Sequence, residues 1–527
     1  MLQPLPLGRS TFSTLRARNE IYVDKTALIH RLAQFDSKIF LARPRRFGKS
    51  LLVSTFESLF KNGLRDFEGL AIEKLWKDKT YPVVRLDFSG LKAYKDLGQF
   101  QIAFQSLLSS VFAPLGFHYD SENQTILFID QFKMWLSAQP PSSFVLLIDE
   151  YDAPLTNHLD SATVFDNIRD YLGEFYAAIK QYEGCLRFFF MTGITKFSNT
   201  SIFSAFNNIE DISLDEKFGE LLGYTEEEIA KYFEAYLQKA QSALQLSKSE
   251  LLVKLREQYD GFSFDRKAAT HVYCPWSVLN FLKRPEEGFR NYWYTSGGQP
   301  TVLMKYLADH ALQSPTVYNE SVLFSISDLG ASRQCDEISV EALLTQAGYL
   351  TIKEGVGGDF VRLGYPNEEV ARSMARLYAA ELLKGQDVAN SGVPSLFKVM
   401  AEQSPETVVS YFNRALGSID YVRYPIENEA ACRAYLQVLL IGVALLPKVE
   451  VHNALGRSDM EVEVGNRHWF FEFKFAKTPA EVQKLLNQAV SQMQSVHYGE
   501  NAANKHLIRV AMVFSAKDRR FSAWKVA

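Results

Sequence analysis

The sequence predicts an α/β protein with a parallel sheet in its N-terminal part, and three observations support this fold class. Short apolar runs alternate with helical patterns between residues 20 and 215. Hydrophobic residues make up 47% of the chain and charged residues 22%, which is ordinary for globular protein and excludes wholesale disorder. The chain has 527 residues, a length that predicts roughly three domains. We expect these domains at residues 1–220, 221–390 and 391–527.

The strands expected in residues 1–220 are short continuous apolar runs, the pattern of strands covered on both faces. They are Ile39–Ala42, Val83–Phe88, Phe144–Ile148, Leu186–Thr192 and Asp211–Leu214. Helical stretches such as Leu51–Phe60 and Phe100–Phe112 lie between them. The alternation favours a parallel sheet with helices on both sides.

Residues 221–390 are expected to form a helical region with a small winged-helix-like unit. A capping-box pattern, Thr225 to Glu228, opens its first helix. A helix at Val340–Ala347, followed by two short strands around Gly355–Gly358, suits a winged helix. The region contains no paired acids or nucleophile, so we expect a lid and coupling region. A polar, Pro-containing stretch, Ala389–Pro394, predicts the next boundary.

Residues 391–527 are expected to form a third domain, in which helices precede strands. The expected strands are Val462–Val464, Trp469–Lys474 and Ile508–Phe514. This part holds 16 Lys+Arg against 13 Asp+Glu, whereas the whole chain has a net charge of −4. Binding to nucleic acid would therefore use a local basic patch, because the chain has no global positive field.

Cysteine content and hydropathy indicate a cytoplasmic protein without a membrane partner. The four cysteines have no pair spacing, which excludes a disulfide scaffold and a Cys-rich zinc site. Met1–Thr11 has no apolar segment of the kind found in signal peptides. The longest apolar stretch, Val438–Leu446, is about half the length needed to span a bilayer.

The first motif has the order of a phosphate-binding loop. The predicted strand Ile39–Ala42 runs into Arg43-Pro-Arg-Arg-Phe-Gly-Lys-Ser50, and a helix follows. Backbone amides of the loop and the positive end of the helix dipole would bind phosphate. The loop residues concerned are Arg45, Arg46, Phe47 and Gly48. Lys49 would reach the β- and γ-phosphates, and Ser50 would ligate Mg²⁺. Arg43 stands where the first glycine is expected, and the alternative interpretation is a basic surface turn.

A second strand supplies the other half of such a site. The predicted strand Phe144–Ile148 ends in Asp149 and Glu150, 100 residues after Lys49. Asp149 would hold the Mg²⁺ shell, and Glu150 would orient and deprotonate the attacking water. By itself this pattern also suits a strand edge with solvated acids. The two motifs in this order predict nucleotide binding.

A third strand ends in Thr192, which could sense the γ-phosphate. The alternative is a capping threonine after a core strand, and the pattern favours neither.

The second constellation consists of two acids and a lysine near the C-terminus. Glu472 and Lys474 are two positions apart on one predicted strand and therefore share a face. Asp459 lies on the neighbouring strand and could approach them across a turn at Gly465-Asn466. Two carboxylates can bind Mg²⁺, and a lysine can position the water that attacks a phosphate. The alternative is a cross-strand salt bridge of Glu472 or Asp459 with Lys474.

Two flanking helices could complete this site. Glu429 begins a predicted helix and could supply a further acidic ligand. Gln492 lies on a helix downstream of the lysine and could orient the site.

These motifs resemble those of a bacterial family that joins an AAA-like ATPase domain to a C-terminal PD-(D/E)XK nuclease-like domain. The matching segments cover nearly the whole chain. They are Tyr22–Thr26, Arg43–Ser50, Ile148–Pro154, Thr192–Lys196, Phe206–Asn208, Tyr259–Phe264, Tyr292–Trp293, Gly456–Lys474 and Gln492–Tyr498. The resemblance implies a P-loop sheet, a restriction-endonuclease-like C-terminal domain, and ATP and Mg²⁺ as cofactors. A missing first glycine is usual in this family, so Arg43 is compatible with nucleotide binding.

The resemblance assigns the C-terminal residues individually. Asp459, Glu472, Lys474 and Gln492 match the nuclease motif directly. Family members often carry a histidine near the start of the preceding helix, and Arg433 occupies that place here. The first acid is therefore Glu429, with Glu427 as the alternative.

Two functions of different classes follow from these expectations. The first is an ATP-controlled, Mg²⁺-dependent nuclease that acts on DNA or RNA, and the family resemblance implies a role such as defence against foreign genetic elements. The second is a nucleotide-dependent switch or scaffold whose nuclease-fold domain binds but does not cut. A homo-oligomer is compatible with both.

Overall fold

A computed structural model of the chain describes residues 2–35, 38–91, 94–122, 125–158, 161–196, 208–295, 315–319, 321–329, 339–382, 396–419, 421–422, 424–442, 445, 447–453, 456–496 and 506–527. The expected boundary Ala389–Pro394 lies outside these residues, as do Phe206 and Tyr498 of the matched motifs. The chain divides into two compact units. Unit 1 is Met1–Ala308 with Glu320–Val370, and unit 2 is Asp309–Asn319 with Ala371–Ala527.

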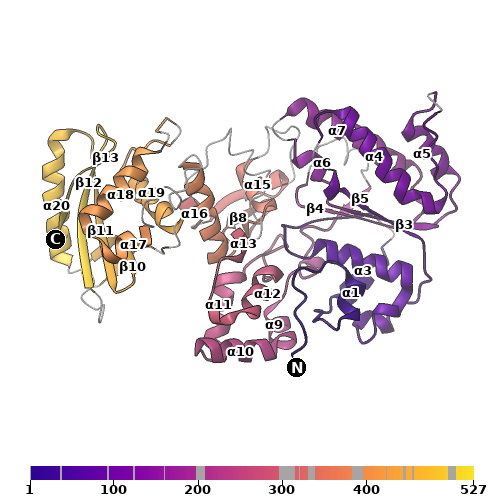
Figure 1. Cartoon of the computed structure of the whole chain (residues 1–527), viewed down its shortest axis with the longest axis horizontal. Coiled ribbons are helices and arrows are strands. Elements are labelled where there is room, and N and C mark those ends of the chain that lie inside the picture. Colours follow the sequence, from indigo (N-terminus) through magenta and orange to yellow (C-terminus); the bar gives the residue numbers. More distant parts are fainter. Residues whose placement is uncertain are drawn as a thin grey trace. The chain divides into compact units, whose positions relative to one another are not determined.

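Unit 1 contains a five-stranded, fully parallel sheet, as the sequence predicts (Figure 1). Its strands are β1 (Lys38–Ala42), β2 (Val83–Asp87), β3 (Phe144–Asp149), β4 (Leu186–Gly193) and β5 (Ile209–Asp211). Their order is β2-β3-β4-β1-β5, so the strand before the phosphate-loop motif and the strand before Asp149 are separated only by β4.

The last of these strands differs from the prediction. We expected Asp211–Leu214, but β5 ends at Asp211. The Asp211 carboxylate accepts a hydrogen bond from the Ser213 amide at 2.9 Å, which turns the chain away from the ladder. The Ser213 hydroxyl then accepts a hydrogen bond from the Ala42 amide at 2.8 Å.

Helices cover both faces of this sheet, and aromatic side chains fill the space between the layers. Figure 1 shows α1 and α3 on one side and α4, α5 and α7 on the other. On the α3 side, the ring centre of Phe56 lies 5.0 Å from the ring centres of both Phe188 and Phe190 of β4. On the other side, Phe104 of α4 meets Phe175 of α7 at 5.3 Å. The helices of this part are α1 (Phe12–Ala17), α2 (Thr26–Ala33), α3 (Lys49–Asn62), α4 (Leu97–Phe112), α5 (Phe128–Ser137), α6 (Ala153–Thr156) and α7 (Ala162–Gln181).

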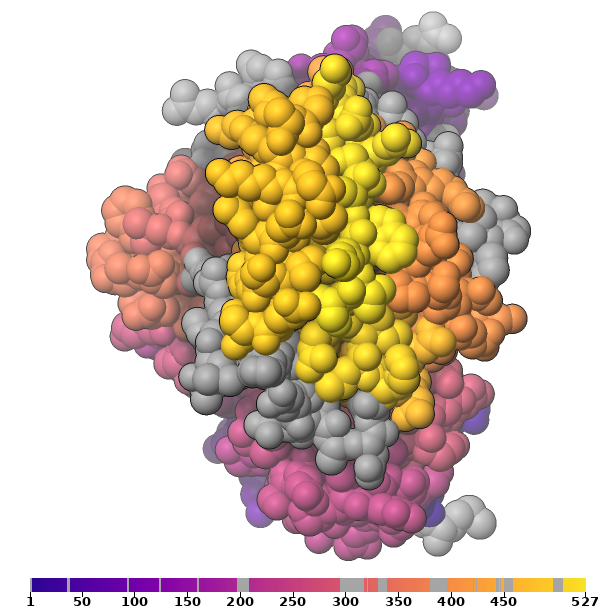
Figure 2. All heavy atoms as spheres, turned by 90° about the vertical axis from the view of Figure 1, so that its left-hand side faces the viewer, coloured from indigo at the N-terminus to yellow at the C-terminus, as the bar shows by residue number. Residues whose placement is uncertain are grey.

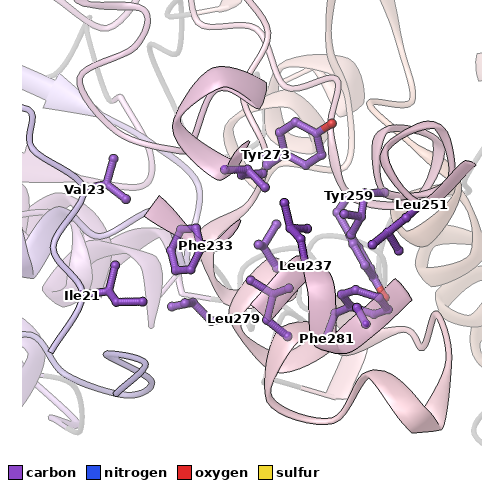
Figure 3. Close-up of a cluster of buried hydrophobic side chains, with 14 residues drawn as sticks. Ile21, Val23, Phe233, Leu237, Leu251, Tyr259, Tyr273, Leu279 and Phe281 are labelled. Carbon is purple, nitrogen blue, oxygen red and sulfur yellow. The ribbon is translucent and has the colours of Figure 1, made fainter. Parts of the chain in front are cut away.

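The region after residue 221 is helical in its first half. Its helices are α9 (Glu226–Tyr232), α10 (Glu234–Leu244), α11 (Lys248–Tyr259), α12 (Pro275–Lys283) and α13 (Tyr292–Thr295). The predicted capping box at Thr225 is present at the start of α9. Figure 3 shows the core of this region, in which Ile21 and Val23 from the N-terminal segment join Phe233, Leu237 and Phe281. The N-terminal segment therefore packs into the helical region.

The second half holds the expected helix and two strands. Helix α15 (Val340–Gln346) is followed by β7 (Thr351–Gly357) and β8 (Phe360–Gly364). A further strand, β6 (Val322–Ser325), completes an antiparallel sheet in the order β6-β8-β7.

Unit 2 contains a mixed five-stranded sheet in the order β13-β12-β11-β10-β9. The strands are β9 (Lys448–Asn453), β10 (Gly456–Val464), β11 (Arg467–Ala476), β12 (His506–Ser515) and β13 (Arg520–Val526). Only β11 and β12 are parallel, and α20 (Val482–Val496) connects them. The other helices are α16 (Glu368–Leu382), which begins in unit 1, α17 (Leu396–Glu402), α18 (Pro405–Gly417) and α19 (Glu429–Gly442). Figure 2 shows one face of this unit, with the yellow surface of the C-terminal strands beside the gold surface of α20.

None of the described helices is long and apolar enough to cross a membrane. Cys185, Cys274 and Cys432 are free and buried, and Cys335 lies outside the described residues.

Candidate functional site

The loop between β1 and α3 has the backbone geometry of an anion-binding turn. Arg46 and Gly48 both adopt left-handed conformations, with φ of 72° and 95°. Glycine adopts this conformation without strain, whereas a non-glycine residue there is uncommon and typical of ligand-binding loops. Helix α3 begins immediately afterwards at Lys49, so its first amide groups lie at the loop. A turn of this kind before a helix N-terminus is suited to phosphate.

Lys49 lies under this loop and is buried. Its Nζ donates hydrogen bonds to the carbonyl oxygens of Arg43 and Pro44, both at 2.9 Å. Burial lowers the pKa of Lys49 to about 8, although the nearby carboxylates of Asp152 and Asp149 act in the opposite direction. The structure thus brings the lysine of the first motif next to the acids of the second.

Asp149 and Ser50 meet at the end of β3. The Asp149 side chain is only 2% exposed, and it forms a hydrogen bond with the Ser50 side chain. Burial raises the pKa of Asp149, while the hydrogen bond with Ser50 and the charge of Lys49 lower it. A serine hydroxyl and a carboxylate in contact form an oxygen donor set that fits Mg²⁺.

Glu150 follows in a left-handed backbone conformation, with φ of 50°. Its amide donates a hydrogen bond to Oδ1 of Asp149 at 3.1 Å. The conformation turns the chain sharply after β3, so that Glu150 is half-buried while Asp149 stays buried. Its role toward water remains a prediction.

Two charged groups of this site were not singled out in the sequence. Asp152 is buried and accepts hydrogen bonds from the amides of Thr195 at 2.8 Å and Ile194 at 3.2 Å. Arg85 of β2 lies 3.7 Å from Asp149. The signal for Asp152 is a third acid, two residues after Glu150. Arg85 has no such signal, because only the pairing of β2 with β3 brings it close to Asp149.

The structure places Thr192 inside the sheet. Its side chain is fully buried, and its hydroxyl donates a hydrogen bond to the Leu41 carbonyl oxygen at 2.7 Å. This bond joins β4 to the neighbouring strand β1, whereas the structural alternative was a capping threonine after the strand. The role of Thr192 toward the γ-phosphate stays a prediction.

Arg43, which stands where the first glycine is expected, makes structural contacts below the loop. Its guanidinium is 1% exposed and donates to the carbonyl oxygens of Ser213 at 2.6 Å and Phe218 at 3.2 Å. The same group lies 4.2 Å from the ring centre of Phe264. Burial lowers its pKa to about 9. Arg43 therefore ties the base of the loop to the chain after β5 and to the middle region.

A small apolar cavity of about 90 Å³ lies beside Gly48 and the first turn of α3. It is lined mainly by apolar and tyrosine side chains, among them Tyr22, Leu51, Leu222 and Tyr224. Such a lining suits the flat face of a base next to a phosphate site.

In unit 2, the acids and the lysine come together on one hairpin. Strands β10 and β11 are antiparallel, and Met460 pairs with Phe471. Asp459 is therefore the cross-strand neighbour of Glu472, one step along the ladder. The Phe473 amide donates a hydrogen bond to Oδ2 of Asp459 at 2.8 Å, which fixes that carboxylate beside the strand.

Lys474 lies between two carboxylates. Its Nζ donates to Oε1 of Glu472 at 2.8 Å and to the Phe473 carbonyl oxygen at 2.9 Å. Glu429 at the start of α19 lies 3.7 Å from the same ammonium. The alternative was a salt bridge of Glu472 or Asp459 with Lys474, and the Glu472–Lys474 ion pair is present, along one strand rather than across two. The structure thus places Glu429 at the site.

Of the other residues assigned by resemblance, Arg433 reaches the acids directly. Its Nη1 lies 3.7 Å from Oδ1 of Asp459. Gln492 is half-buried on α20, whose residues Ala489 and Met493 pack against the sheet. Among the described residues, no hydrogen bond joins its side chain to the acids or the lysine. Glu427 is exposed before α19.

The charges of this hairpin fit a hydrated divalent cation. Glu472 is fully buried, and burial and the charge of Asp459 raise its pKa to about 7, against the effect of Lys474. In the described part of the chain, no three His, Cys, Asp or Glu side chains are grouped to hold a metal ion. Mg²⁺ needs only one or two carboxylates, because it keeps several waters. Asp459 and Glu472 fit that mode of binding.

Comparison with known proteins agrees with both halves of this description. Residues 6–203 match the family described as predicted AAA-ATPase, and residues 428–524 match the PD-(D/E)XK nuclease superfamily. A curated relative from Azotobacter chroococcum mcd 1, named as an uncharacterized protein in the vnfD 5′ region, is 30% identical over 508 residues. That alignment covers 94% of this chain and 93% of the relative.

The chain belongs to the family that joins these two domains. It is therefore a nucleotide-binding, nuclease-like protein. The AAA-ATPase match contains the loop, Lys49 and Asp149, and the nuclease match contains Glu429, Asp459 and Lys474.

Proposed function

We propose that this protein hydrolyses ATP in unit 1 and cuts phosphodiester bonds of DNA or RNA in unit 2. The observation that carries the proposal is the meeting of Asp459, Glu472 and Lys474 on one hairpin, in a chain that also joins Lys49, Ser50 and Asp149. A structural salt bridge between Glu472 and Lys474 would not explain why a second carboxylate, that of Asp459, is also buried there.

In unit 1, the loop and Lys49 would bind the phosphates, with the base in the apolar cavity beside Gly48. Ser50 and Asp149 would hold Mg²⁺. Glu150 would accept a proton from the attacking water.

In unit 2, Asp459 and Glu472 would hold a divalent ion, with Glu429 as a further oxygen ligand. When bound, such an ion lowers the pKa of a coordinated water and neutralises charge on the phosphate. Lys474, held by Glu472, would orient the attacking water. An activity of this kind would suit defence against foreign genetic elements.

The test is cleavage by the purified full-length protein with Mg²⁺ or Mn²⁺ on plasmid, single-stranded DNA and RNA. We expect Asp459→Ala to lower the rate by about 100-fold or more, because the loss of a metal site costs several kcal/mol. Lys474→Ala should spare metal binding and lower turnover. Glu402→Ala, an exposed acid on α17, is the matched control. No cleavage by the wild type, with nucleic acid still bound, would favour the switch or scaffold instead.

A further inference from the structure

The nuclease centre contains a second cation that the proposed chemistry has not used. Arg433 follows Glu429 by one turn of α19, so both side chains are on the same face of that helix. Lys474 contacts Glu472 and Glu429, whereas Arg433 lies against Asp459. The charge of Arg433 also acts on Glu429, so the two cations share one acidic cluster.

The contact between Arg433 and Asp459 is loose. The 3.7 Å between Nη1 and Oδ1 exceeds the length of a charge-assisted hydrogen bond, which is about 2.7–2.9 Å. Asp459 is instead fixed through its other oxygen, by the Phe473 amide at 2.8 Å. Arg433 is thus not needed to hold Asp459 in place. Its side chain is 19% exposed, so a ligand can reach it from solvent.

The charge of the centre also favours an anion at this position. With three carboxylates ionised and two cations present, the centre carries a net charge of −1, and one divalent ion changes that to +1. A phosphodiester carries the opposite charge. Among side chains, the planar guanidinium matches two phosphate oxygens at once, which a lysine does not.

We propose that Arg433 binds the phosphodiester that the centre cuts. This inference rests on the proposed nuclease function and assigns its substrate-binding residue. A bidentate contact between arginine and phosphate fixes the orientation of the reacting group, which a divalent ion held by carboxylates alone does not.

The experiment compares Arg433→Ala and Arg433→Lys with the wild type in the full-length protein. Arg414→Ala, an exposed arginine on α18, is the charge-matched control. We expect Arg433→Ala to raise the KM for nucleic acid by about 10- to 100-fold, because hydrogen bonds to charged groups are worth about 1.5–3 kcal/mol. The KM of Arg433→Lys should fall between those of the wild type and Arg433→Ala. Arg414→Ala should leave the KM nearly unchanged.

Binding of Mn²⁺ without nucleic acid, measured by calorimetry, separates this role from a structural one. Removal of a nearby positive charge should leave Mn²⁺ affinity unchanged or raise it. Weaker Mn²⁺ binding in Arg433→Ala, or an unchanged KM, would overturn the inference while the nuclease function stands. If the wild type does not cut, the proposed function fails. Oligonucleotide affinity with Mg²⁺, measured by fluorescence anisotropy, then tests whether Arg433 binds the phosphodiester. Weaker affinity in Arg433→Ala supports this role, and unchanged affinity overturns it.

Discussion

Lys49 is buried and Lys474 is half-buried, and the oxygen atoms that contact their ammonium groups suit the two lysines to different tasks. Lys49 donates to two neutral carbonyl oxygens, and burial lowers its pKa to about 8. Burial also acts to lower the pKa of Lys474, but the hydrogen bond and charge of Glu472 outweigh it, so the net pKa is raised. The charge of Lys49 is incompletely stabilised and would be stabilised by phosphate. That of Lys474 is already compensated, which suits a positioning role.

At this scale we expect the two ATP-site substitutions to separate binding from turnover. Lys49→Ala should weaken ATP binding by about 10-fold or more, because it removes a charged donor to the phosphates. Glu150→Gln should bind ATP as the wild type does and hydrolyse it more slowly, because the amide cannot accept the proton from water. Calorimetry and phosphate release measure the two effects. Wild-type ATP affinity in Lys49→Ala would refute the loop assignment.

The sequence could predict the residues of both sites that follow from local order. Lys49, Ser50 and Asp149 are found together, as are Asp459, Glu472 and Lys474, because strand ends and hairpin alternation fix them. Arg85 and the contact of Arg433 with Asp459 could not be predicted, since each depends on the pairing of elements distant in the chain. The sequence leaves the role of Thr192 open between a γ-phosphate sensor and a capping threonine. The bond of its hydroxyl to Leu41 could not be predicted, because it depends on the pairing of β1 with β4.

At the scale of elements, the phosphate loop is packed against the middle region by aromatic rings. Phe47 is 1% exposed. Its ring centre lies 4.9 Å from that of Phe262 and 5.0 Å from that of Phe264, both in edge-to-face contacts. Gly348 has φ of 82°, and a Cβ there would lie 2.7 Å from Pro44, so this glycine permits close packing against the loop. The shape of the loop therefore depends on residues of the middle region.

We expect Phe264→Leu to weaken ATP binding by about 3- to 10-fold, since it removes an aromatic pair and the ring beneath Arg43. Phe281→Leu is the matched control, because Phe281 is fully buried in the helical core of the same region. Thermal unfolding reports the stability of each variant. If both variants lower ATP affinity equally, the effect is general destabilisation and the loop is not positioned by Phe264.

The sequence predicted the elements whose ends are set by neighbouring residues. It did not predict those whose extent depends on the pairing of strands. The capping box at Thr225 and the turn at Gly465-Asn466 carry their own signals, and Gly465 has φ of 58°. The end of β5 differs from the prediction because the Asp211 carboxylate accepts a hydrogen bond from the Ser213 amide, which ends the strand. Strands β9 and β13 were not predicted, because edge strands lack the continuous apolar run that identified the central ones.

At the scale of the whole molecule, α16 is the element shared by the two units. Its first turn belongs to unit 1, and its remaining residues belong to unit 2. In unit 1, buried Glu369 accepts hydrogen bonds from the Trp293 amide at 2.9 Å and the Ser277 hydroxyl at 2.7 Å. Trp293 stacks on Phe262 at 5.5 Å, and Phe262 meets Phe47 of the phosphate loop.

The other end of α16 is in contact with α19, the helix that carries Glu429 and Arg433. Tyr378 of α16 stacks on Tyr435 of α19 at 6.5 Å, and α19 begins at Glu429. Packed groups thus lead from the phosphate loop to the first turn of α16 within unit 1, and the rest of α16 contacts α19 within unit 2. Coupling through α16 requires that both of its ends influence one equilibrium.

We expect Glu369→Gln to uncouple the two activities. In the wild type, ATP should change the rate of Mg²⁺-dependent cleavage, and Lys49→Ala should abolish that response while leaving cleavage without ATP unchanged. Glu369→Gln should keep ATP affinity within about 3-fold and keep basal cleavage, because it touches neither site, yet lose most of the response to ATP. The neutral amide still fills the buried space but holds its three donors, the amides of Tyr292 and Trp293 and the Ser277 hydroxyl, less strongly. Asp459→Ala, which should hydrolyse ATP normally, shows that unit 1 acts without unit 2. A full ATP response in Glu369→Gln would exclude this start of α16 as the link, and the coupling would have to pass through other residues.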